Sequence, residues 1–281
     1  MSELTIEEKK AKVKDLRPID DVFFEVLARN PGVMEEILCT ILEDDKLIVK
    51  DVIVQSDERN LYGRSVRLDA LCLLGNGISC NVEVQRSDND DHFRRVRFNE
   101  SSITVRDSQS GTDFKEIPDV HVVYISEFDI IGAGHTIYHV NKVIAETGQI
   151  VDDGTGYVYV NTAIDDGTDI SSLMSCFTKK DFNNPKFPKL SKEVSYLKTT
   201  EGGLNSMCTV MKYYEDIAEQ KGRSEGRSEG LAEGKRLSYF EMVQDGDLNV
   251  KKAAQKTNLT EEEFLKEMEL AGFKLPKEQT V

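Results

Sequence analysis

Two carboxylates, Asp69 and Glu83, lie in apolar segments on either side of a short glycine-rich loop. The segments 66–74 and 78–85 are rich in Val, Leu and Ile, as buried strands are, and the Gly-Asn-Gly sequence at 75–77 is typical of a hairpin loop. The two carboxylates are therefore predicted to lie on adjacent antiparallel strands.

A three-residue loop pairs Leu74 with Ile78, and the same register along the hairpin places Asp69 directly opposite Glu83. Gln85 shares their face of the sheet because side chains alternate along a strand. Directly opposed like charges destabilise a sheet. The pairing therefore favours a site for a positive ion, and oxygen ligands suit a divalent cation such as Mg²⁺ or Mn²⁺.

An Asp on one strand followed by Glu-x-Gln on the next resembles the PD-(D/E)XK nuclease superfamily, in which some branches have Gln in place of the Lys. The flanking segments Arg17–Glu25, Phe93–Phe98 and Val120–Ile125 are similar to the transposase-like branch, the recombination-promoting nucleases. The resemblance extends over roughly residues 15–200. It implies an α/β fold with a mixed central sheet flanked by helices, a restriction-endonuclease-like core, and a C-terminal helical extension.

The same resemblance implies a site and an activity. The implied catalytic residues are Asp69, Glu83, Gln85 and Glu25, and the implied metal ligands are Asp69, Glu83 and the backbone carbonyl of Val84. Mg²⁺ or Mn²⁺ is the implied cofactor. The implied function is that of a metal-dependent DNA endonuclease, acting on duplex DNA and linked to recombination or mobile elements.

Two departures from the branch keep a second function open. Glu25 stands where the branch usually has a Lys after the Phe of the first helix, and Asn99 stands where a later helix usually has a Tyr. Both departures favour a catalytically inactive nuclease-like module for binding or assembly. A two-carboxylate glycosidase ranks third, because the chain has no Trp that could stack on a sugar.

The overall charge limits how the chain could bind DNA. A net charge of −15 argues against a protein that coats DNA through bulk electrostatics, because phosphate binding relies on Lys and Arg. A metal site and a small basic strip can still neutralise phosphate locally. We expect Arg94, Arg95 and Arg97 to form that strip, although they could instead pair with the acidic residues of 90–100 along a helix.

Composition places the chain among cytoplasmic globular proteins. Hydrophobic residues make up 39% and charged residues 31% of the 281 residues. No apolar run approaches the ~20 residues that span a bilayer, and residues 1–14 lack the apolar stretch of a signal peptide. The five cysteines form no CxxC pair, so reduced thiols are expected. We predict no membrane association.

The elements that must position the carboxylates follow from apolar periodicity. Helices are predicted at 18–28, 33–42, 88–106, 169–182 and 190–196, and strands at 47–54, 120–126, 136–143 and 156–162 in addition to the hairpin. A helix lies between the hairpin and the strand at 120–126. The crossover that it provides predicts that this strand joins the same sheet in parallel with a neighbour.

Three domains are predicted, a nuclease-like domain at 1–202, a helical Glu-Gly repeat extension at 203–248 and a small C-terminal helical pair at 249–281. The repeat has Gly at every fourth position from Gly222 onward, which would let another helix approach closely.

Further along the chain, Leu237, Phe240 and Val243 share one helical face that needs a partner. We therefore expect a homodimer through the C-terminal helices. The last two helices resemble part of a helix-turn-helix, but the second is too acidic for a DNA groove.

Overall fold

The computed structural model describes residues 5–58, 66–111 and 113–276. The chain divides into two compact units, one that ends at Lys212 and one that begins at Tyr213. The first unit contains the central sheet and its helices. The second contains most of one long helix and two short ones. The helices of the described residues include none that is long and apolar enough to cross a membrane.

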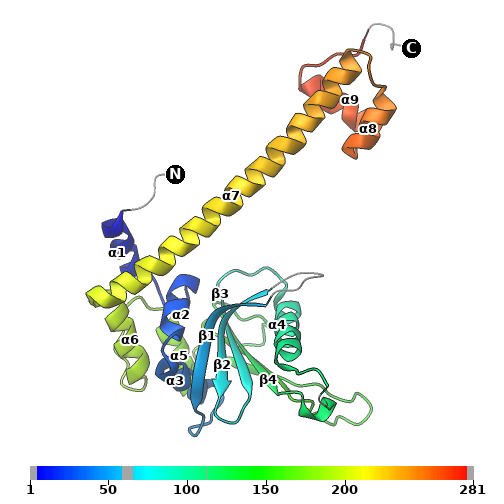
Figure 1. Ribbon diagram of the computed structural model, residues 1–281. Helices are drawn as coiled ribbons and strands as arrows, with labels where there is room; N and C mark the ends of the chain where they lie inside the picture. The colour runs from blue at the N-terminus through cyan, green and yellow to red at the C-terminus, as the bar shows by residue number, and fades with distance from the viewer. Residues whose placement is uncertain (1–4, 59–65, 112, 277–281) are drawn as a thin grey trace. The chain divides into compact units, whose positions relative to one another are not determined.

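The first unit is built on a mixed sheet whose six strands run in the order β1-β2-β3-β4-β6-β5 (Figure 1). The strands are β1 (Val49–Glu58), β2 (Val66–Leu74), β3 (Ser79–Gln85), β4 (Val120–Ser126), β5 (Ile137–Val140) and β6 (Thr155–Asn161). The pairs β1–β2, β2–β3 and β5–β6 are antiparallel, whereas β3–β4 and β4–β6 are parallel. The parallel pairing predicted for the strand at 120–126 is confirmed.

The β2–β3 hairpin has the predicted register. The amide of Leu74 donates to the carbonyl of Ile78 at 2.9 Å, which closes the three-residue loop. Cys72 then pairs with Cys80, and Ala70 with Val82. Gly77 in the loop has a φ of 91°, a backbone conformation that residues with a Cβ rarely adopt. The short loop thus sets which side chains face each other further along the strands.

Helices cover both faces of the sheet. Those of the first unit are α1 (Ile6–Asp15), α2 (Asp21–Ala28), α3 (Pro31–Ile41), α4 (His92–Asp107), α5 (Asp169–Phe177) and α6 (Pro188–Thr199), with a 3₁₀ turn at Phe114–Glu116. In Figure 1, α4 lies on one face of the sheet, and α2 and α3 lie on the other. The fully buried Phe23, Leu27 and Ile37 belong to the core between α2, α3 and the sheet. This layered arrangement is the α/β fold that the sequence predicts.

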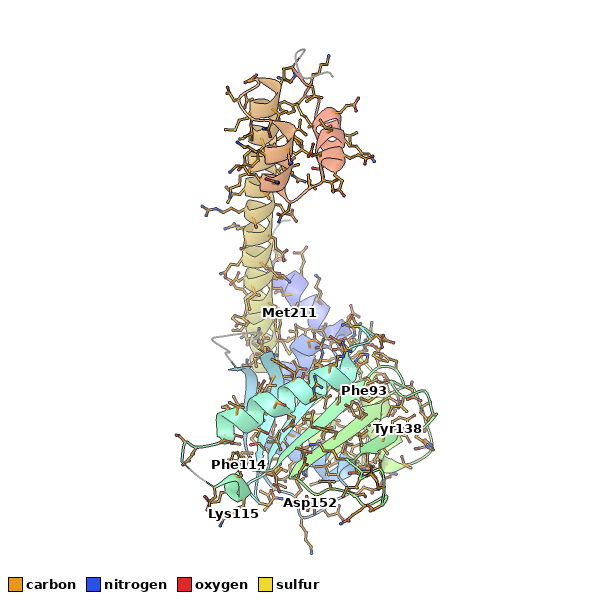
Figure 2. All side chains as sticks on the ribbon, turned by 90° about the vertical axis from the view of Figure 1, so that its right-hand side faces the viewer. Phe93, Phe114, Lys115, Tyr138, Asp152 and Met211 are labelled. Atoms are coloured by element: carbon orange, nitrogen blue, oxygen red, sulfur yellow. The ribbon has the colours of Figure 1, made fainter. Side chains whose placement is uncertain are left out.

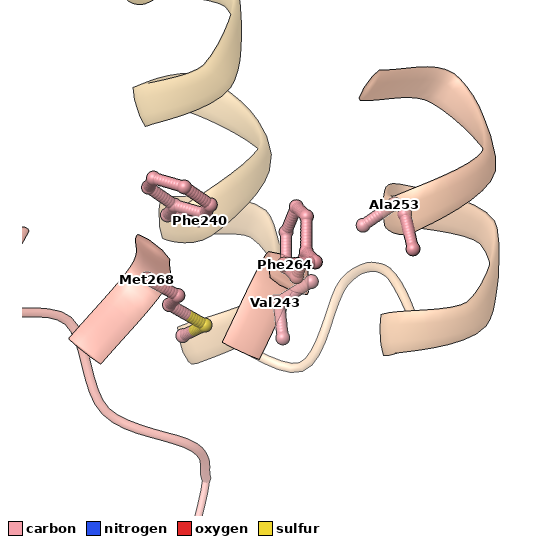
Figure 3. Packing of buried hydrophobic residues seen from close by; sticks show 6 residues of the cluster. Phe240, Val243, Ala253, Phe264 and Met268 are labelled. Carbon is pink, nitrogen blue, oxygen red and sulfur yellow. The ribbon is translucent and has the colours of Figure 1, made fainter. Parts of the chain in front are cut away.

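The helix α7 (Glu201–Gln244) begins in the first unit and ends in the second, which also contains α8 (Val250–Thr257) and α9 (Glu261–Leu270). Phe240 and Val243 are buried in a small core with residues of α8 and α9, among them Phe264 and Met268 (Figure 3). Phe240 and Val243, two residues of the helical face predicted to need a partner, are therefore covered within the chain, whereas Leu237 is 39% exposed. Periodicity shows that a face is apolar, but not which segment covers it, so the homodimer stays a prediction.

Candidate active site

The two predicted carboxylates meet across the hairpin. The backbone amide of Asp69 donates to Oε1 of Glu83 at 3.2 Å, and the amide of Val84 donates to Oδ2 of Asp69 at 3.1 Å. Asn81, two residues before Glu83 on the same face, donates from Nδ2 to Oε1 of Glu83 at 2.8 Å. Asp69 and Glu83 are thus cross-strand neighbours on one face, as the register predicts.

Both carboxyl groups are held where ionisation is costly. Glu83 is buried. Asp69 as a whole residue is partly exposed, but the protein surrounds its carboxyl group. Burial raises the pKa of Asp69 well above its ordinary value, and the neighbouring charge of Glu83 raises it further. Burial also raises the pKa of Glu83. A pair in this situation is stabilised by a shared proton or by a cation.

A third carboxylate comes from the start of α2, and it is Asp21. Crowding by the surrounding protein raises the pKa of Asp21, and its charge in turn raises the pKa of Asp69. Asp21 is exposed, and it lines the same surface depression as Gln85 at the end of β3. Sequence reasoning missed this residue, although the adjacent acids Asp20 and Asp21 at a predicted helix start were a signal.

The predicted helical carboxylate, Glu25, lies one turn after Asp21 in a different setting. Glu25 is buried and receives a hydrogen bond from Nη2 of Arg29 at 2.7 Å. Its second oxygen, Oε2, is buried without a hydrogen-bond partner. The ion pair with Arg29 lies within α2, so Glu25 is engaged in its own helix.

Gln85 lies at the end of β3, beside a depression of about 450 Å³. Its Nε2 donates to the carbonyl of Ser87 at 2.5 Å. Asp20 and Asp21 of the α2 start also line this depression. The depression therefore connects solvent with the end of the sheet at which Asp21 and Gln85 lie.

The helix α4 passes over Glu83. The three arginines predicted to bind DNA lie on this helix and differ in their exposure to solvent. Arg94 and Arg97 are exposed, whereas Arg95 is partly buried and its positive charge lowers the pKa of both Asp69 and Glu83. Asn99, one turn after Arg95, is 1% exposed, and neither its Nδ2 nor its Oδ1 has a hydrogen-bond partner. Asn99 lies near enough to Glu83 to lower the pKa of that carboxyl group.

An aromatic row continues from Glu83 across the parallel strands. Glu83 pairs with Tyr124 of β4, and Tyr124 pairs with Tyr159 of β6. The ring of His92 shares a hydrogen bond of 2.9 Å with the Tyr124 hydroxyl group, and Phe93 packs edge-on against Tyr159 with 5.2 Å between ring centroids. Phe93 is labelled on α4 in Figure 2, above the same part of the sheet. These contacts fix the N-terminal half of α4 over the site.

The donor set suits a hard divalent cation. Each carboxylate accepts the hydrogen bonds above on one oxygen, so Oδ1 of Asp69 and Oε2 of Glu83 accept none from a described residue. Within the described part of the chain, no group of three or more His, Cys, Asp or Glu side chains has the geometry of a metal site. A cation here would therefore draw on two carboxylates, backbone carbonyls and water, which Mg²⁺ and Mn²⁺ accept.

The fold and the site together define a restriction-endonuclease-like α/β protein with its acidic residues on the central hairpin. The chain belongs to the PD-(D/E)XK nuclease family transposases, whose family model matches residues 19–164. The match includes the hairpin, α2 and α4. It is shorter than the stretch of roughly residues 15–200 over which the sequence resembles the transposase-like branch. No curated protein and no solved structure matches the chain.

Proposed function

We propose that this protein is a metal-dependent DNA endonuclease that hydrolyses phosphodiester bonds. The observation that carries the proposal is the buried pair of opposed carboxylates, Asp69 and Glu83, on the central hairpin of a nuclease-family fold. A bound Mg²⁺ or Mn²⁺ would lower the pKa of a water molecule and stabilise charge on phosphate oxygens. Recombination or the movement of mobile elements is the proposed context.

The chain's own residues have distinct proposed roles. Asp69 and Glu83 would hold the cation, and the backbone carbonyl of Val84 is the proposed third ligand. Gln85 lines the depression, and its amide is proposed to orient water or a phosphate oxygen, although an amide supplies no charge. We assign the helical carboxylate to Asp21 in place of Glu25, because Asp21 acts on Asp69 and Glu25 is paired with Arg29.

Duplex DNA is the proposed substrate. Arg94 and Arg97 are exposed on α4, beside the site, and can contact backbone phosphates. Because both side chains are exposed to solvent, we assign them to positioning the DNA and not to the chemical step. With a net charge of −15, such contacts would be few, so binding should be strongest when the cation is present.

The test is cleavage of supercoiled plasmid DNA by the full chain with Mg²⁺ or Mn²⁺, with EDTA, and with the variants Asp69→Asn and Glu83→Gln. We expect cleavage only with metal and a loss of at least ~100-fold in each variant. Asp51→Asn, which changes an exposed carboxylate on the neighbouring strand β1, serves as the matched control. Metal-independent cleavage, or full activity of Asp69→Asn, contradicts the proposal.

A second candidate is a catalytically inactive nuclease-like module for binding or assembly. The unpaired, buried amide of Asn99 beside Glu83 favours it, since a polar group without a partner is unusual in a fully adapted site. This candidate predicts DNA or partner binding without cleavage at any metal concentration. Gel-shift and cleavage assays on the same preparation separate the two functions.

A further inference from the structure

The site has a shortage of positive charge. Asp21, Asp69 and Glu83 bring three carboxylates to one end of the sheet, and Gln85 stands where the family signature has Lys. Hydrolysis of a phosphodiester builds negative charge on phosphate oxygens, and enzymes stabilise that charge with fixed cations and hydrogen-bond donors. A cationic side chain within reach of the carboxylates would supply part of that stabilisation.

The arginine next to Gln85 is already engaged. Arg86 forms an ion pair with Asp20 at 2.7 Å and a longer one with Glu127 at 3.4 Å. Arg17 is likewise held by Glu127, at 2.5 Å from its Nη1. These four residues form a closed group of charges beside the depression, so neither arginine is free to bind a phosphate without leaving a partner.

Arg95 is placed differently. Its one ion pair to a described residue is a contact of 3.7 Å from its Nε to Oδ1 of Asp91, too long for a hydrogen bond. The Nε atom is shielded from solvent and has no hydrogen-bond partner, while 34% of the side chain is exposed. The guanidinium group thus reaches solvent while its inner end lies within the protein.

The position of Arg95 on α4 also points to the site. Arg95 precedes Asn99 by one helical turn, and Asn99 lies beside Glu83. His92 and Val96, which flank Arg95 along the helix, are buried against the Tyr124 part of the sheet, next to Glu83 in register. The two neighbours hold this turn of α4 in place.

We propose that Arg95 contacts the scissile phosphate and supplies the positive charge that Gln85 cannot. The planar guanidinium group donates paired hydrogen bonds to two phosphate oxygens and keeps all its protons throughout the reaction. Arg95 thereby holds the phosphate over the carboxylates and stabilises the charge that builds on its oxygens. This assignment rests on the proposed endonuclease function.

The test compares Arg95→Ala with Lys115→Ala, which removes an exposed cation of the 3₁₀ turn that has no assigned role, in plasmid cleavage by the full chain. We expect Arg95→Ala to lower kcat by about 100- to 1,000-fold. Lys115→Ala should leave both kcat and KM close to those of the wild type. Added guanidinium ion should restore part of the activity of Arg95→Ala, because it can occupy the vacated position.

Three results would overturn the assignment. Arg95→Ala could cleave at the wild-type rate, or its loss could be unaffected by guanidinium, or it could lose Mn²⁺ binding in calorimetry together with cleavage. The last two outcomes would mean that Arg95 shapes the carboxylate pair and does not touch the phosphate. If wild-type protein and Asp69→Asn both fail to cleave with metal, the endonuclease function itself fails. If Asp69→Asn alone is inactive while Arg95→Ala is active, only Arg95 is excluded.

Discussion

At the scale of single residues, the opposed carboxylates of Asp69 and Glu83 are an unfavourable arrangement in the metal-free protein. Burial raises the pKa of both groups, and the charge of Glu83 raises that of Asp69 further, which means that the folded chain binds their protons more tightly than the unfolded chain. Their contribution to stability is therefore fully present below about pH 4 and is lost as the pH rises through the raised values. The pair therefore lowers the stability of the metal-free protein at neutral pH.

The substitution Asp69→Asn should leave the stability of the metal-free protein unchanged or increase it at neutral pH, while abolishing metal binding. The Asn oxygen can still accept the hydrogen bond from Val84, and the repulsion with Glu83 disappears. Thermal melts from pH 4 to pH 8, with and without Mg²⁺, measure this, and the advantage of the variant should grow with pH. A loss of more than ~2 kcal/mol would instead identify Asp69 as a structural acceptor.

At the scale of secondary structure, several helices are held by polar contacts that join distant segments. Lys198 of α6 is buried, and its Nζ donates to the carbonyls of Lys14 at 3.1 Å, Leu16 at 2.6 Å and Lys180. It also lies 5.4 Å from the ring centroid of Phe23 in α2. The ammonium group of Lys198 thus links α6 to the end of α1 and to the segment that follows α5.

The substitution Lys198→Met should destabilise the first unit by roughly 2–4 kcal/mol, because three carbonyl groups lose their donor while the volume of the side chain is kept. Denaturant unfolding of the full chain measures the change. Lys192→Met, at an exposed position of the same helix, is the matched control and should change stability by less than ~0.5 kcal/mol. Equal effects of the two variants would show that the three contacts contribute nothing.

At the scale of the whole molecule, the second unit is a small helical assembly with its own core around Phe264. Its long helix still carries exposed apolar side chains, Leu231, Leu237 and Met242, and the glycines from Gly222 onward have open space beside them. The homodimer remains a prediction. Its support is now these exposed side chains, since Phe240 and Val243 are covered inside the chain.

The full chain should sediment as a dimer at micromolar concentration, and a variant with Leu231, Leu237 and Met242 each changed to Gln should sediment as a monomer. Replacing exposed apolar side chains by polar ones weakens association without disturbing a buried core. A triple variant with an unchanged thermal melt and an unchanged sedimentation coefficient would contradict the prediction. The three side chains would then lie on a solvent-exposed linker helix.

What the sequence by itself determined was local. The register of the β2–β3 hairpin follows from a three-residue loop and the two-residue alternation of strands, so the meeting of Asp69 and Glu83 could be predicted by counting. The helical content after residue 201, and the capping box of Thr260 and Glu263 at the start of α9, are equally local. The helix α1 was missed because it has few apolar positions for periodicity to detect.

Only the tertiary structure decided which distant residues complete the site. Asp21 and Arg95 come from helices that pack on the sheet, and the charges of both act on Asp69 because of how those helices are placed. Arg94 and Arg95 are adjacent residues of the same type, and the rotation of α4, set by apolar packing of residues such as Val96, decides that Arg95 acts on Asp69. Asp21 and Glu25 share a face of α2, so their positions along the helix distinguish them. Local patterns carry no information about that rotation, and the fold supplies it.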